Sequence, residues 1–276
     1  MKKLKKTLLI CLAISGLSGL LWVGNAFLGN PVSRALAVRA ADQHLQEHYP
    51  NTDYQILRVA YTFKTTSYYA YVESPSSMDT HFTIYFDMLG NAKYDTYDSV
   101  EDGWNTARRL DSEYRKLTDQ VFNDPELPYD NSSIYSILFG ELEIYPLEFI
   151  QDPNISDIPD YALVQDDLVL DQAYDIRELG ALAGHLVIYV DSEELTPEAA
   201  AAIMLDFKAR FDQANIPFYA MDMTLRHPIR EDGTREPGDF IILDFPYSEM
   251  NKEGLAERLL QAHKAATAYY DALDDK

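Results

Sequence analysis

Residues 80–88, THFTIYFDM, decide the fold of this chain, because apolar and polar side chains alternate along them. Phe82, Ile84, Phe86 and Met88 point to one side of an extended chain, and the residues between them point to the other side. This pattern is typical of a β-strand with one face on a hydrophobic core and one polar face. We therefore predict a sheet that helices cover on one side.

The neighbouring segments extend this strand into a complete domain. Asn30-Pro31 is a typical helix start, and the buried stripe of that helix is predicted to include Val38 and Ala41. The predicted elements are this helix at 31–49, strands at 57–63, 68–73 and 80–88, a short strand ending near 97, and a helix at 99–121. Residues 30–122 are thus expected to form a first α+β domain, a β-meander with helices on one face.

A second α+β domain is predicted after a linker. Residues 123–133 (NDPELPYDNSS) contain two prolines and no apolar periodicity, which indicates a linker. Residues 134–276 then follow with strands at 186–190, 219–225 and 240–245 and helices starting near 196 and 255. The predicted fold class is α+β, with an antiparallel or mixed sheet covered by helices in each of two small domains.

The first 29 residues are predicted to be a transmembrane anchor. Residues 7–29 carry no charge and would span roughly 33 Å as a helix, enough to cross a hydrocarbon core of about 30 Å. Four lysines precede them, which predicts a cytoplasmic N-terminus and extracellular C-terminal domains at the cell membrane. Cleavage as a signal peptide is the alternative, since Gly24 and Ala26 are small residues two apart, but the apolar stretch is long for one.

The composition is that of an acidic globular protein. The chain has 45 acidic and 23 basic residues, a net charge of −22. A surface of this charge repels phosphate backbones, which argues against binding to nucleic acid. Cys11 is the single cysteine, so no internal disulfide can form. Cysteine-free ectodomains suit an exporter with little disulfide machinery, such as a Gram-positive bacterium.

Several short segments of the first domain carry a family resemblance. They are Gly29-Asn30-Pro31, Ser74-Pro75-Ser76-Ser77, Asp79-Thr80-His81-Phe82, Tyr94-Asp95, Gly103-Trp104-Asn105-Thr106 and Glu113-Tyr114. In them the chain resembles the YfjL-like family of single-pass membrane proteins of Gram-positive bacteria, and its second half is similar to that family in the order of elements. The resemblance implies the anchor and the two-domain layout, and it implies no reaction, cofactor or substrate.

One segment matches a zinc-protease pattern. His44, Glu47 and His48 form H-x-x-E-H, in which two histidines one helical turn apart bind zinc and the glutamate acts as a general base. A third protein ligand is not identifiable, and a polar helix face explains the same letters. We therefore predict no metal at this segment.

Other polar groups are predicted to be structural. Ser77 and His81 would lie about 13 Å apart in an extended chain, too far for a nucleophile and its base unless a local turn shortens the span. The acids at 166, 167, 171 and 175 lack the glycine turn and terminal glutamate of a calcium-binding EF-hand loop, which favours loop and helix-cap roles. His263 lies on an apolar helix stripe and is expected to be a hydrogen-bonded core residue. No catalytic, cofactor-binding or metal-binding residue is predicted.

The expected function is a non-catalytic binding module of the cell envelope, with a protein or peptide as partner. An envelope hydrolase, possibly metal-dependent, is the alternative. The predicted binding site is the loop before strand 80–88 and the polar side of that strand, at Ser77, Asp79, His81 and Tyr85. These side chains would lie on the face that the predicted helices leave open, unless that face packs on the second domain or simply meets water.

Overall fold

The computed structural model describes residues 15, 16, 19, 23–25, 27–129, 137–155 and 158–274. The chain divides into two compact units, Met1–Thr106 and Ala107–Lys276, which we call the N-terminal unit and the C-terminal unit. The predicted anchor at 7–29 lies largely outside the described residues. Among the helices of the described residues, none is long and apolar enough to cross a membrane.

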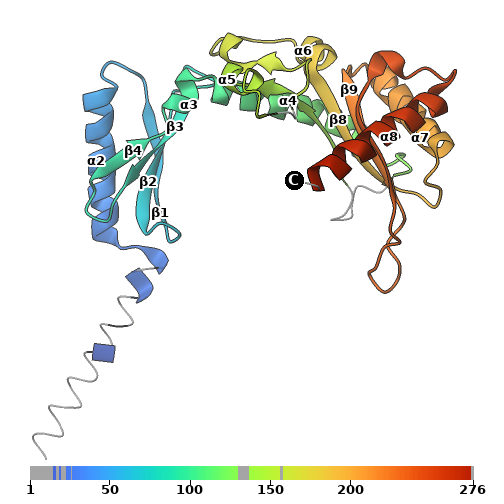
Figure 1. The fold of residues 1–276 in the computed structure, drawn as a ribbon. Helices are drawn as coiled ribbons and strands as arrows, with labels where there is room; N and C mark the ends of the chain where they lie inside the picture. The colour runs from blue at the N-terminus through green and yellow to red at the C-terminus, as the bar shows by residue number, and fades with distance from the viewer. Residues whose placement is uncertain are drawn as a thin grey trace, which may run out of the picture. The chain divides into compact units, whose positions relative to one another are not determined.

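The N-terminal unit is a four-stranded antiparallel meander with a helix on one face (Figure 1). Its strands are β1 (Gln55–Thr62), β2 (Ser67–Glu73), β3 (His81–Phe86) and β4 (Ala92–Asp95), paired in sequence order. Helix α2 (Pro31–His48) lies along one side of this sheet. Phe82, Ile84 and Phe86 of β3 are buried beneath it, as their alternation predicted.

Helix α2 begins where the sequence predicted. The side chain of Asn30 accepts a hydrogen bond from the backbone N–H of Ser33 at 2.7 Å, and Pro31 occupies the first helical position. Small residues, Ser33, Ala37 and Ala41, form the buried stripe of the helix. The predicted stripe was wrong at Val38, which is 40% exposed. The small side chains let the helix backbone lie close to the sheet. Apolar periodicity alone does not reveal that this face of the helix is the buried one.

The C-terminal unit contains a mixed four-stranded sheet with the order β10–β9–β8–β5 (Figure 1). Its strands are β5 (Ile137–Leu142), β8 (Gly184–Asp191), β9 (Ala220–Arg226) and β10 (Asp239–Pro246). Strands β8 and β9 are parallel, joined by helix α7 (Pro197–Ala214), and the other pairs are antiparallel. The smaller elements are β6 (Ile144–Tyr145), β7 (Leu163–Val164), α5 (Leu147–Ile150), α6 (Ile176–Ala183) and the 3-10 turns η1 (Gln165–Asp167) and η2 (Tyr247–Glu249).

Helices α7 and α8 (Leu255–Asp274) pack together against one face of this sheet. Leu186, Ile188, Met221 and Met223 point from the central strands into the core beneath them, and all four are fully buried. The prediction that both halves are α+β, with antiparallel or mixed sheets and helices, is therefore confirmed.

The border between the two units differs from the predicted linker at 123–133. Helices α3 (Asp98–Glu101) and α4 (Trp104–Phe122) follow the first sheet, and α4 crosses the border at Thr106/Ala107. Its later residues, among them Leu117 and Phe122, belong to the core of the C-terminal unit. Tyr129, inside the predicted linker, stacks on Phe207 at 4.7 Å. The stripe of α4 was predicted, but it was expected to pack on the first sheet, and the structure places it in the C-terminal unit instead.

Candidate functional site

The outer face of the N-terminal sheet, opposite α2, carries a row of aromatic rings. Tyr69 and Tyr85 are cross-strand partners with ring centroids 6.4 Å apart, and Tyr85 stacks on Tyr94 of β4 at 4.7 Å. The guanidinium of Arg58 lies 5.6 Å from the centroid of the Tyr69 ring. We call this surface the tyrosine face; it consists of Arg58, Tyr69, Tyr71, His81, Tyr85 and Tyr94.

Two of the four predicted binding residues lie on the tyrosine face. His81 and Tyr85 are half-buried there, and the ring of His81 is 6.0 Å from that of Tyr71. Asp79 does not lie there: its side chain is fully buried and accepts a hydrogen bond from the Thr106 hydroxyl at 3.0 Å. The geometry therefore gives Asp79 a role in holding the loop rather than in contacting a partner.

Ser77 likewise holds the loop that leads into β3. Its hydroxyl donates to Thr80 Oγ1 at 2.7 Å and accepts from the backbone N–H of Thr80 at 2.8 Å. The amide of Asn105 donates to the carbonyl oxygens of Asp79 and His81. The loop is thus tied to the start of α4 by side-chain hydrogen bonds.

The H-x-x-E-H segment lies on α2 and makes contacts inside the N-terminal unit. His44 Nε2 is 2.7 Å from Asp95 Oδ2, which also accepts from the Tyr49 hydroxyl at 3.0 Å. The His44 and His48 rings lie 4.3 Å apart, and Glu47 accepts a hydrogen bond from Gln43. Among the described residues, neither group of side chains that brings three metal-ligand atoms together includes His44 or His48.

The other polar residues singled out in the sequence have local partners. Asp175 caps α6, accepting from the N–H groups of Arg177 and Glu178, and Asp166 accepts from the N–H of Leu147 at 2.8 Å. His263 Nδ1 accepts from the Ile241 N–H at 3.1 Å, and its ring stacks on Phe240. The predictions of capping roles for these acids and of a hydrogen-bonded His263 are confirmed.

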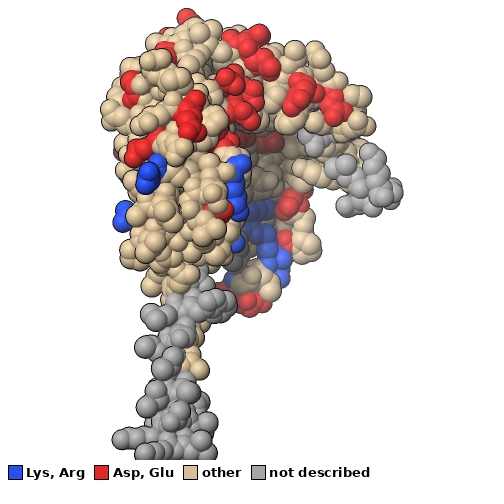
Figure 2. All heavy atoms as spheres, turned by 90° about the vertical axis from the view of Figure 1, so that its left-hand side faces the viewer, with Lys and Arg blue, Asp and Glu red and all other residues tan. Residues whose placement is uncertain are grey.

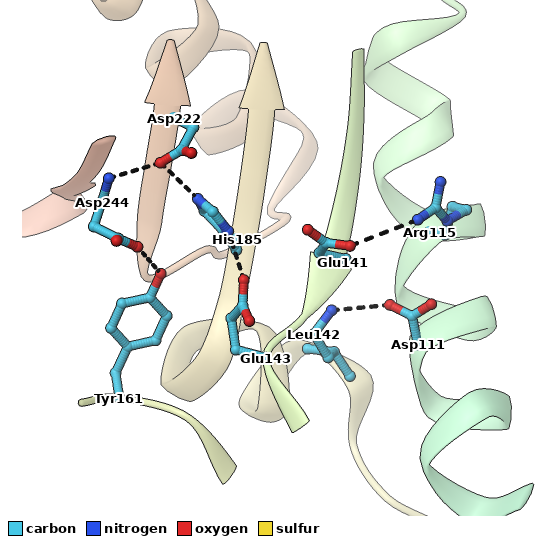
Figure 3. Close-up of polar contacts among 9 residues, drawn as sticks. All are labelled: Asp111, Arg115, Glu141, Leu142, Glu143, Tyr161, His185, Asp222 and Asp244. Atoms are coloured by element: carbon cyan, nitrogen blue, oxygen red, sulfur yellow. Dashed lines mark hydrogen bonds and ion pairs between the residues drawn. The ribbon is translucent and has the colours of Figure 1, made fainter. Parts of the chain in front are cut away.

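A second polar site lies on the outer face of the C-terminal sheet (Figure 3). His185 on β8 and Asp222 on β9 point away from the helix-covered core, and Asp244 on β10 reaches the same place. Glu143 follows β5 directly and joins them from the other side of His185. We call these four residues the histidine–carboxylate cluster.

His185 lies at the centre of this cluster, and its side chain is only 8% exposed. Its Nδ1 is 2.6 Å from Glu143 Oε1, a short hydrogen bond. Its Nε2 is 3.0 Å from Asp222 Oδ1, an ion-pair distance, yet the direction of approach gives no hydrogen bond at this nitrogen. One ring nitrogen is therefore fully engaged, and the other lacks a well-aligned partner.

A β-bulge places Asp244 in the cluster. The pairing of β10 with β9 shifts between Ile242 and Phe245, and Asp244 adopts a left-handed backbone with φ of 47°. Bulges of this kind redirect a side chain at a sheet edge, and left-handed backbone in a non-glycine residue costs free energy. The N–H of Asp244 donates to Asp222 Oδ1 at 2.6 Å, and the Tyr161 hydroxyl donates to Asp244 Oδ1 at 2.7 Å. The bulge thus fixes two carboxylates beside one imidazole.

The crowding of carboxylates changes proton affinities. Burial alone would lower the pKa of His185, but the negative charges of Asp222 and Glu143, together with the hydrogen bond to Glu143, outweigh it and raise the pKa to about 10. Burial and the charge of Asp222 raise the pKa of Asp244, although the Tyr161 hydroxyl opposes the shift. Burial and the charge of Glu143 likewise raise the pKa of Glu141. The cluster has more negative charge than its single imidazole balances.

A cavity of about 450 Å³ opens onto the cluster, within the size range of small-ligand sites. Glu143, His185, Asp222 and Asp244 contribute to its wall, together with apolar and aromatic groups that include Ile158. Among the described residues of the wall there is no serine, threonine, cysteine or lysine. The carboxylates and the imidazole of the wall can bind a cation or polarise a water.

Comparison with known proteins places both units in one family. Residues 4–96 match the YfjL-like N-terminal domain, and residues 113–260 match the YfjL-like C-terminal domain. The chain belongs to the YfjL-like family. No curated protein and no solved structure matches the sequence. The resemblance seen in the first domain is confirmed and extends through most of the second. The tyrosine face and the histidine–carboxylate cluster lie within the YfjL-like N-terminal and C-terminal matches, respectively.

Sequence analysis missed the cluster of this YfjL-like protein because its members are far apart in the chain. His185 and Glu143 are 42 positions apart, and Asp244 and Asp222 are 22 apart. A signal was present, since His185 precedes an apolar strand and Asp222 stands between Met221 and Met223. Ionisable residues on the outer side of two central strands are uncommon enough to suggest a site.

Proposed function

We propose that this YfjL-like protein is a membrane-anchored, extracytoplasmic binding module, and that the tyrosine face binds another protein of the cell envelope. The composition of that face carries the proposal. Four tyrosines, Arg58 and His81 lie together on the side of the sheet opposite α2. Tyrosine and arginine are the residue types most enriched among the side chains that dominate protein–protein binding energy.

The proposed partner is a protein for two reasons. The rings are held by strand pairing, so that little conformational entropy is lost when a partner surface covers them. Acidic side chains are also more prominent than basic ones on the surface in Figure 2, in keeping with the net charge of −22, which disfavours nucleic acid as a partner. The face belongs to the unit that directly follows the proposed anchor, which favours a partner in or near the membrane.

The proposed topology, with a cytoplasmic N-terminus in a Gram-positive cell, rests on the uncharged segment at 7–29 and the lysines before it. The single cysteine makes it testable. In a Cys11→Ser background, Ser248→Cys introduces one exposed thiol in the C-terminal unit. A membrane-impermeant maleimide should label it in intact cells, and intact-mass measurement should show the N-terminus retained. Labelling only after lysis contradicts the topology.

Site-specific cross-linking of the full-length chain in membranes tests partner binding. A benzophenone amino acid at position 85 or 94 should cross-link to a second protein, whereas the same group at exposed Phe149 of the C-terminal unit should not. Tyr71→Ala should reduce the adducts, since it removes a neighbouring part of the face. Adducts with a second copy of this chain alone would indicate self-association instead. No adduct at 85 or 94 would show that the face binds no protein.

A metal-dependent hydrolase is the second candidate function, and the histidine–carboxylate cluster favours it. The described wall of the cavity holds an imidazole and carboxylates that could bind a metal ion, and a water activated by that ion would be the nucleophile of hydrolysis. Model ester, phosphodiester and peptide substrates should then be turned over by the wild type and not by Asp222→Asn. Equal activity in both proteins would exclude this site as the source.

A further inference from the structure

We infer that the C-terminal unit binds a divalent transition-metal ion, with His185, Asp222 and Asp244 as its protein ligands. The inference does not depend on partner binding by the tyrosine face. It rests on four features of the described residues: the convergence of ligand atoms, an unused imidazole nitrogen, a supporting carboxylate and an excess of negative charge.

The ligand atoms converge on one point. One atom from each of His185, Asp222 and Asp244 lies within 4.8 Å of the other two. Ligand atoms bound to one ion at about 2.1 Å are separated by roughly 3–4 Å. The three ligand atoms therefore need to move only slightly closer together to bind one ion. The three side chains come from β8, β9 and β10, neighbouring strands of one sheet. A sheet holds such groups more rigidly than loops do.

The Nε2 atom of His185 is the strongest pointer to a metal. It belongs to a side chain more than nine-tenths buried, it faces the carboxylate of Asp222 at 3.0 Å, and it makes no hydrogen bond among the described residues. Buried polar atoms without hydrogen bonds are rare, because leaving them unpaired costs free energy. A cation bound between Nε2 and this carboxylate would satisfy both groups. When the ion binds, any proton on Nε2 passes to solvent.

Glu143 provides the support that metal-binding histidines usually have. Its Oε1 lies 2.6 Å from Nδ1 of His185, so that the ring is oriented with Nε2 toward Asp222. Two ligands of one ion normally lie roughly 3 Å or more apart, which makes Glu143 a hydrogen-bond partner and not a ligand. The other convergent group, Glu141, Glu143 and His185, is excluded for the same reason.

The charge balance of the site also favours a cation. Among the described residues, Glu143 and Asp222 form ion pairs with His185 alone. Asp244 lies beside Asp222, with its backbone N–H 2.6 Å from Asp222 Oδ1, so that two carboxylate charges are held close together. A divalent ion would offset this repulsion without a further side chain. The mixed nitrogen and oxygen donors fit Zn²⁺ and Mn²⁺ better than Ca²⁺ or Mg²⁺, which prefer oxygen alone. Coordination positions left open would face the cavity.

Calorimetric titration of the full-length, chelator-treated chain in detergent tests the inference. Zn²⁺ or Mn²⁺ should bind at one ion per chain, and Asp222→Asn and Asp244→Asn should each weaken binding at least about 100-fold. Glu143→Gln should weaken it roughly 10–100-fold, as loss of a supporting hydrogen bond does. Co²⁺ should give a ligand-field absorption spectrum that changes in Asp222→Asn, and circular dichroism of each variant verifies folding.

Two controls separate this site from other acids and histidines. Asp191→Asn alters a carboxylate on the same sheet that pairs with Arg226 and Arg235, and it should bind the ion as the wild type does. The His44→Ala/His48→Ala variant should also bind normally. Loss of the ion in that double variant, unchanged affinity in both asparagine variants, or no stoichiometric binding by the wild type would each overturn the inference.

Discussion

The two sheets of this YfjL-like protein share an arrangement and differ in what their outer faces carry. Each has four strands and one face covered by helices. The outer face of the first displays tyrosine rings that touch one another, such as Tyr85 and Tyr94. The outer face of the second encloses His185 among carboxylates, with a cavity beside it.

The difference shows how the chemistry of an outer face indicates its partner. Tyrosines at a sheet surface place apolar rings against each other and keep hydroxyls near water, so that a protein surface can cover them at little cost. Carboxylates crowded around a buried imidazole repel one another unless a positive charge accompanies them. One face therefore suits a macromolecule, and the other suits a cation. Five predictions test this separation, four of them ordered by their effect on stability and the last by its effect on metal affinity.

The largest effect should come from removing one matched core side chain from each unit. Ile84 in β3 and Ile188 in β8 are both fully buried, and their replacement by alanine should cost about 2–5 kcal/mol. If the units unfold separately, Ile84→Ala should lower hydrogen-exchange protection in β1–β4 only, and Ile188→Ala in β5 and β8–β10 only. Equal loss of protection in both units from either variant would show that they unfold as one.

The second effect concerns Asp79, which the sequence placed in the binding site. Asp79→Ala leaves the Thr106 hydroxyl, itself 1% exposed, without its acceptor, and should destabilise the N-terminal unit by about 1–3 kcal/mol. Compared with Asp79→Ala, Tyr85→Ala should reduce the free energy of unfolding less and the yield of partner cross-links more. Denaturant melts together with cross-linking from position 94 compare the two variants. If Asp79→Ala has normal stability but loses the cross-links, Asp79 takes part in binding the partner.

The core of each unit could be predicted from sequence because burial leaves a local pattern. The alternation at 82, 84 and 86 and the Asn30-Pro31 cap depend on neighbours in the chain, and both appear in the structure. The border between units could not be predicted, because the stripe of α4 is visible locally and its partner is not. Leu117 and Phe122 pack in the C-terminal core, which only tertiary structure reveals.

The candidate site was predictable in part for the same reason. Alternation along β3 predicted that His81 and Tyr85 lie on the outer side of the sheet, and they do. The hydrogen bonds that bury Asp79 depend on Thr106 and Asn105 in another element. The histidine–carboxylate cluster requires a strand order and a bulge. A register shift at Ile242–Phe245 is what brings Asp244 to Asp222, and no local pattern records it.

The third effect is a pH dependence confined to the N-terminal unit. Burial alone would raise the pKa of Asp95, but hydrogen bonds from His44, the N–H of Tyr97 and the Tyr49 hydroxyl lower it below its ordinary value of 3.8. A lowered pKa means that Asp95 stabilises the fold above pH 3.8 and that this contribution is lost as the pH falls through the folded pKa.

Asp95→Asn should therefore lower the free energy of unfolding at neutral pH by about 1–2 kcal/mol. It should also flatten the acid limb of the plot of melting temperature against pH. Glu47→Gln, which changes a carboxylate on the exposed side of α2, serves as the control and should keep that limb. Hydrogen exchange at pH 3 and pH 7 assigns the change to the N-terminal unit. An unchanged acid limb in Asp95→Asn would mean that other carboxylates set it.

The smallest effect compares two stacked tyrosine pairs, one from each unit. Tyr85 and Tyr94 stack at 4.7 Å with 22° between ring planes, and Tyr161 and Tyr219 at 4.3 Å with 26°. Double-mutant cycles with threonine replacements should give coupling energies of about 0.5–1 kcal/mol for both pairs, because the ring geometry is nearly the same. A coupling several times larger in one unit would show that stacking, and not polar chemistry, distinguishes the faces.

The hydroxyl groups of these pairs should then separate the two faces. Tyr161→Phe keeps its stack on Tyr219 but removes the hydrogen bond that the hydroxyl donates to Asp244, so Mn²⁺ affinity should fall roughly 10-fold while the melting temperature changes little. Tyr85→Phe, the matched change on the tyrosine face, should leave Mn²⁺ affinity unchanged. Calorimetry on both variants measures the difference. If Tyr161→Phe binds Mn²⁺ as tightly as the wild type, the hydroxyl does not position Asp244, and the bulge alone must hold that carboxylate in the site.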